Sequence, residues 1–69
     1  MDKKIVAVAK AVAVEMSEKF MMSPRDTVNT FIIAYMYYQD GDDTTTVKAK
    51  VLEDYRTCMK SVLEEKADG

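Results

Sequence analysis

The 69-residue sequence contains no histidine, no tryptophan and only one cysteine, Cys58. Without histidine the chain lacks the commonest transition-metal ligand and the commonest general base, so we expect no metal site and no cofactor. A single cysteine forms no intrachain disulfide, and the position of Cys58 in an apolar stripe predicts a buried, unreactive thiol. Because so short a chain has little room for a substrate pocket, we expect no catalytic residue, no small-molecule substrate and no enzymatic activity.

Long apolar runs and an excess of one charge are absent too. The longest apolar run, residues 31–38, falls well short of the roughly 20 residues that cross a bilayer. Lys10 divides the apolar stretch 5–14, which argues against a signal peptide. The formal net charge of −2 is typical of an ordinary solvated surface. These features predict one domain, residues 1–69, that is cytoplasmic and has no membrane partner.

Apolar residues recur at helical spacing in the first segment, and this pattern predicts a helix over about residues 3–22. The stripe comprises Ile5, Ala9, Val12, Met16 and Phe20. Valine and alanine also alternate with strand period across residues 5–14, so a strand is the alternative for this part of the segment.

A helix start follows at Ser23-Pro24, because serine caps a helix and proline suits its first position. This second helix is expected over about residues 24–39. Gly41 then favours a C-terminal stop, because glycine adopts the left-handed conformation without strain. An amphipathic third helix is predicted over about residues 44–66. Its apolar side contains the seam Leu52, Tyr55, Met59 and Val62, followed by Leu63.

Short connections between three helices predict an all-α fold. The sequence leaves two forms open: a compact three-helix bundle, or a helical hairpin completed by dimerisation. A chain of this length can bury only a limited fraction of its surface when it folds. Without disulfides or metals, a second subunit is the remaining means of stabilisation.

The second helix is apolar on both sides, and two neighbouring helices cannot cover its whole circumference. We therefore predict that one side forms a protein-binding surface. The first candidates are Ile33, Met36 and Tyr37, with contributions from Tyr38 and Tyr55. The expected function is that of a small protein–protein interaction module, a regulator, adaptor or inhibitor that acts by binding. We expect a homodimer first, and a larger protein partner in addition.

The alternative function is a dimeric DNA-binding regulator of the ribbon-helix-helix or helix-turn-helix type. The first of these requires a strand at residues 5–14. The second would bring Asp40, Asp42 and Asp43 close to the phosphates, which carry the same charge. Nucleic acid is therefore the less favoured partner.

Overall fold

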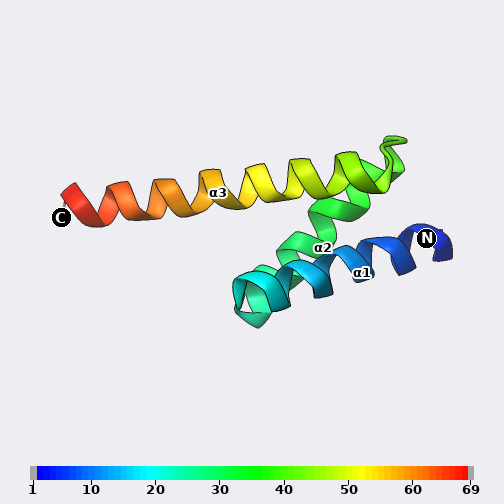
Figure 1. The fold of residues 1–69 in the computed structure, drawn as a ribbon, viewed down its shortest axis with the longest axis horizontal. Coiled ribbons are helices and arrows are strands. Elements are labelled where there is room, and N and C mark those ends of the chain that lie inside the picture. The colour runs from blue at the N-terminus through cyan, green and yellow to red at the C-terminus, as the bar shows by residue number, and fades with distance from the viewer. Residues whose placement is uncertain (1, 69) are drawn as a thin grey trace.

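A computed structural model of the chain describes the backbone of residues 2–68 and the side chains of residues 2–61. It contains three helices, α1 (Lys3–Phe20), α2 (Pro24–Gln39) and α3 (Thr44–Asp68), and residues 2–68 include no strand (Figure 1). The predicted all-α class is confirmed. The strand alternative for residues 5–14 is wrong, because this stretch lies within α1.

The first turn is set by residues on both of its sides. Helix α1 ends at Phe20, two residues earlier than predicted, because Met21 adopts the left-handed conformation at φ 52°. The Met22 N–H then donates to the Ser17 carbonyl at 3.0 Å. Helix α2 begins at Pro24 as predicted, and the Ser23 hydroxyl accepts a hydrogen bond of 3.2 Å from the Asp26 N–H.

The second turn is set by a glycine and an aspartate. Gly41 has φ +99°, a value that favours glycine, and the N–H of Asp42 donates to the Tyr37 carbonyl at 3.2 Å. Asp43 caps α3 by accepting a 2.8 Å hydrogen bond from the Thr46 N–H. Hydrogen bonds from the side chain and backbone of Thr46 hold the pKa of Asp43 below its ordinary value.

The helices are arranged as a hairpin with a longer third helix across it. Helices α1 and α2 run antiparallel and make the most extensive helix–helix contact, whereas α3 returns along α2 (Figure 1). At a rise of 1.5 Å per residue, the 25 residues of α3 span about 37 Å and the 16 residues of α2 about 24 Å. The C-terminal part of α3 therefore extends past the turn between α1 and α2 (Figure 1).

Small side chains form most of the core. Its buried residues come from all three helices and are Ala9, Val12, Ala13, Met16, Thr30, Ala34, Val47 and Val51. Ala9 and Ala34 are both fully buried, and they lie at nearly equal distances along the chain from the first turn. In an antiparallel hairpin such positions face one another, so alanines there allow the two backbones to approach closely.

Larger apolar side chains lie outside this core. More than a third of the surface of each remains exposed for Val8, Val14, Met21, Val28, Ile32, Met36 and Met59. The prediction that Cys58 is buried is wrong, since this cysteine is exposed. It lies in the segment of α3, residues 56–61, in which every residue is exposed. Val62 and Leu63, predicted on the same apolar side, lie outside the residues whose side chains are described.

The contact between α1 and α2 gives a first prediction. Ala9→Leu forces extra volume into a fully buried position, and we expect it to lower the free energy of unfolding by about 1–3 kcal/mol. Ala7→Leu is the matched control, because Ala7 is exposed on the same helix. Urea denaturation followed by circular dichroism measures both changes. Equal stability of the two variants would contradict close packing at Ala9.

Candidate protein-binding surface

The first part of the surface is a ridge along α2, which we call the outer strip: Val28, Ile32 and Met36. Residues four apart on a helix lie on one face. The exposed fractions of these side chains are 56%, 49% and 57%, respectively. Three exposed apolar side chains in a row form a continuous apolar ridge, which differs from the scattered apolar residues of an ordinary surface.

The second part is a groove between α2 and α3, with a volume of about 300 Å³. Thr30 and Val51 are buried at its base, and Ile33 and Tyr55 form its half-buried walls. The remaining lining residues are Ile32, Cys58 and Met59, together with the polar Asp26, Asn29 and Asp54. Its lining is predominantly apolar. We call it the α2–α3 groove.

The base of the groove leaves no polar side chain unpaired. Thr30 is the buried polar residue there, and its hydroxyl donates to the sulfur of Met22 at 3.5 Å. Among the described side chains, no buried nitrogen or oxygen atom lacks a hydrogen-bond partner. The base of the groove is therefore suited to apolar contacts, since it has no buried polar atom without a hydrogen-bond partner.

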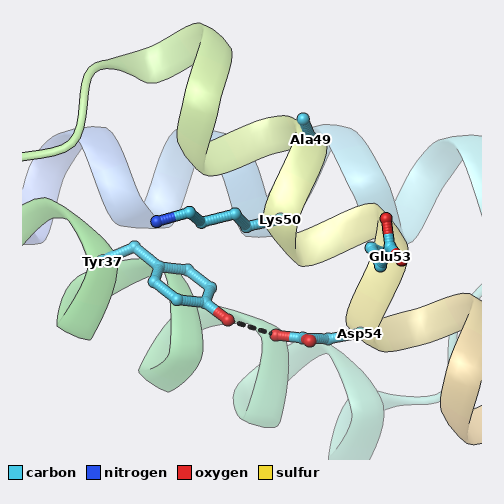
Figure 2. A pocket seen from close by; sticks show the side chains of 5 residues that line it. All are labelled: Tyr37, Ala49, Lys50, Glu53 and Asp54. Carbon is cyan, nitrogen blue, oxygen red and sulfur yellow. Dashed lines mark hydrogen bonds between the residues drawn. The ribbon is translucent and has the colours of Figure 1, made fainter.

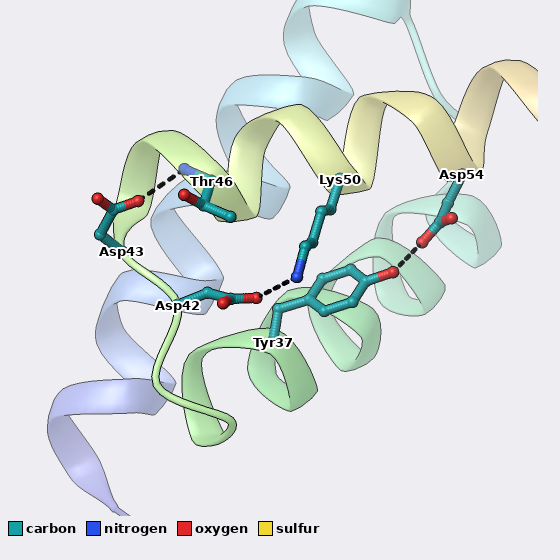
Figure 3. A network of polar contacts seen from close by, with 6 residues as sticks. All are labelled: Tyr37, Asp42, Asp43, Thr46, Lys50 and Asp54. Carbon is teal, nitrogen blue, oxygen red and sulfur yellow. Dashed lines mark hydrogen bonds and ion pairs between the residues drawn. The ribbon is translucent and has the colours of Figure 1, made fainter.

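A group of polar contacts next to the groove fixes α3 on α2, and we call it the Tyr37 clamp. The Tyr37 hydroxyl donates to the Asp54 carboxylate at 2.6 Å, which joins α2 to α3 (Figure 2). The Lys50 ammonium donates to Asp42 in the turn at 2.7 Å and lies 5.1 Å from the centre of the Tyr37 ring (Figure 3). The clamp thus connects α2, the second turn and α3 through one tyrosine.

The clamp also changes the acidity of its tyrosine. The hydrogen bond to Asp54 raises the pKa of Tyr37 above its ordinary value of 10.0, and partial burial and the negative charge of Asp54 raise it further. Each of these effects disfavours the phenolate. Tyr37 is therefore neutral and a hydrogen-bond donor throughout the physiological pH range.

The residues predicted for the binding surface separate into different environments. Ile33 and Tyr55 meet in the groove, and Met36 lies on the outer strip. Tyr37 packs against the core within the clamp, and Tyr38 does so near the second turn, where its hydroxyl donates to Thr44 at 3.0 Å. The structure therefore brings Ile33 and Tyr55 together but does not place Ile33, Met36 and Tyr37 on one open strip.

Four exposed apolar residues of the surface, Val28, Ile32, Cys58 and Met59, were not among the predicted candidates. Cys58 was expected to be buried, and Met59 was expected in the seam of the third helix. A signal for the true inner face exists in the sequence. Thr30 and Ala34 are small residues four apart, as are Ala9 and Ala13 in α1. Such pairs are typical of close helix packing and would have pointed the larger side chains outward.

Metal binding and membrane insertion were also considered for the described residues. Residues 2–61 include no group of three histidine, cysteine, aspartate or glutamate side chains arranged to hold a metal ion. None of the described helices has the length and apolar character required to cross a bilayer. The sequence matches no protein-family model, no curated protein and no solved structure. The geometry of the described residues is therefore the basis for assigning a function.

The Tyr37 clamp gives a second prediction. Asp54→Asn removes the negative charge beside Tyr37, so we expect the pKa of this tyrosine to fall toward 10.0. Ultraviolet absorbance of the phenolate measures the titration, and subtracting the curve of the matching Tyr37→Phe protein isolates Tyr37. An unchanged curve in Asp54→Asn would show that the hydrogen bond does not form.

The same shift determines a dependence of stability on pH. Since the folded protein holds the Tyr37 proton more tightly than the unfolded chain does, its contribution to stability is complete below the unfolded pKa near 10. That contribution decreases as the pH rises through the higher folded pKa. The Tyr37→Phe protein should therefore lose less stability than the wild type between pH 9 and 11.

Proposed function

We propose that this protein is a small non-enzymatic interaction module, a regulator, adaptor or inhibitor that acts by binding another protein chain. Its binding surface is the outer strip of α2 together with the α2–α3 groove. The first partner is a second copy of the chain, in a homodimer, and a larger protein partner would use apolar surface of the same kind.

The observation that carries this proposal is the distribution of side-chain size. Alanine and valine account for most of the core, whereas Ile32, Met36 and Met59 are 49%, 57% and 42% exposed. Full burial of one such side chain contributes about 1.5–3 kcal/mol, which is a large fraction of the stability of a short chain. Phe20, Phe31 and Leu52 are half-buried against the core, but these three aliphatic side chains of α2 and α3 are not. Their exposure favours a surface that is covered in a complex.

The described residues do not favour the DNA-binding alternative. A ribbon-helix-helix dimer reads DNA with a strand from each chain, and residues 5–14 are helical. In a helix-turn-helix arrangement, the N-terminal end of the recognition helix approaches the DNA. Here Asp42 and Asp43 precede α3, and the Asp43 carboxylate is engaged as its cap.

A pair of glutamate substitutions tests the proposal. Ile32→Glu places a charge on the outer strip, and we expect it to raise the dissociation constant of the dimer roughly tenfold or more. Val14→Glu is the matched control, because Val14 is also β-branched and 43% exposed but lies on α1. Size-exclusion chromatography with light scattering, across a range of concentrations, measures assembly.

Both substitutions replace a β-branched residue with a better helix former, so neither should unfold the chain. Circular dichroism checks this point. If Ile32→Glu proves unstable, Met36→Glu on the same strip replaces it. Equal effects of the α1 and α2 substitutions on assembly, or a wild-type monomer at every concentration, would count against self-association through this surface.

A further inference from the structure

The protein has a larger surface than a compact chain of its size. Its accessible surface is 5247 Å², whereas a compact folded chain of 7.8 kDa is expected to have about 4400 Å². The excess of roughly 850 Å² is close to the roughly 800 Å² that each partner buries in a standard protein–protein interface. One interface with a second copy would bury an area of this size.

The C-terminal part of α3 is the most conspicuous source of uncovered helix. From Arg56 to Ser61 every residue is exposed, including Cys58 and Met59, which line the groove. The groove is lined by residues from the first part of α2 and the middle of α3. These two helices diverge toward the C-terminal end of α3 (Figure 1). An uncovered helix and an unfilled groove thus lie side by side in one molecule.

We infer that the α2–α3 groove of one chain receives residues 56–61 of α3 from a second copy, so that two α3 helices pack antiparallel across a twofold axis. This inference rests on the proposed function and specifies its geometry. The pairing is reciprocal: each chain supplies a groove and a helix. The two α2 and two α3 helices then form a four-helix core with knobs-into-holes packing.

The distribution of residues around α3 suits this pairing. Helical periodicity places Val51, Tyr55, Cys58 and Met59 on the side toward the groove, and all four are uncharged. Glu53 and Lys60 fall on the opposite side and remain in water. Two carboxylates also line the groove. Asp54 of α3 accepts the hydrogen bond from the Tyr37 hydroxyl, and Asp26 lies in the first turn of α2, where the helix dipole favours a negative charge. Both charges therefore keep a favourable contact within their own chain when the two α3 helices meet.

The outer face of α1 fits the groove less well. Its exposed residues include the small Ala7 and Ala11, with Lys10, Glu15 and Glu18 among them. Alanine fills little of a 300 Å³ groove, and the charged neighbours would lose water on entering it.

The native cysteine provides the test. In the antiparallel pair Cys58 is covered, whereas it is exposed in the single chain. The rate of Cys58 modification by a maleimide should therefore fall roughly tenfold or more as the protein concentration rises through the dissociation constant measured by light scattering. The matched control combines Cys58→Ser with Lys60→Cys, which moves the thiol two positions along α3 to the side facing water. Its modification rate should not change with concentration.

A second pair of variants tests the same helix without chemical modification. Met59→Glu should raise the dissociation constant of the dimer at least tenfold, and Lys60→Glu should change it less than twofold. A dimer in which Cys58 stays reactive, or in which both thiols are protected equally, would overturn the α3 pairing and leave the proposed function standing. A monomer at every concentration would overturn the pairing together with self-association.

Discussion

The close approach of α1 and α2 is the constraint on which the rest of the structure depends. It requires small side chains where the two helices face each other, and Ala9, Ala13, Thr30 and Ala34 meet that requirement. Once α2 has turned this narrow face toward α1, its larger apolar residues must lie elsewhere around its circumference. Some of them reach α3, and the others remain in water. The exposed outer strip is thus a geometric consequence of the alanine contact.

The attachment of α3 is of a different kind. Only Val47 and Val51 of the described α3 residues are buried, so apolar packing holds the first half of the helix, whereas residues 56–61 are exposed. The Tyr37 clamp supplements this limited packing with directional contacts that link Asp54 and Lys50 to α2 and the second turn. Exposed ion pairs contribute little to the free energy of unfolding. The main effect of these contacts is therefore to fix the angle between α2 and α3. The angle in turn determines how wide the α2–α3 groove opens.

The fold could be predicted further from the sequence than the surface could. Caps and turns depend on residues that are adjacent in the chain, which is why Ser23, Pro24 and Gly41 marked the helix ends correctly. The inner face of α2 depends on its fit to another helix, and apolar residues on both sides made periodicity uninformative. The burial of Cys58 depends on the length of α3 relative to the two helices that pack against it. A helical pattern shows which residues share a face, but it does not show where the covering helix stops.

In the proposed dimer, a third helix longer than its neighbours would couple stability to assembly. Residues 56–61 of α3 are exposed in the single chain, and short helical segments without tertiary packing are marginally stable in water. A partner that covers these residues would supply the missing apolar contacts, so binding should lower the free energy of the folded state by mass action. The stability of α3 and occupation of the α2–α3 groove would then be linked equilibria. In the proposed interaction module, such a link would make the stability of the folded chain depend on the concentration of its partner.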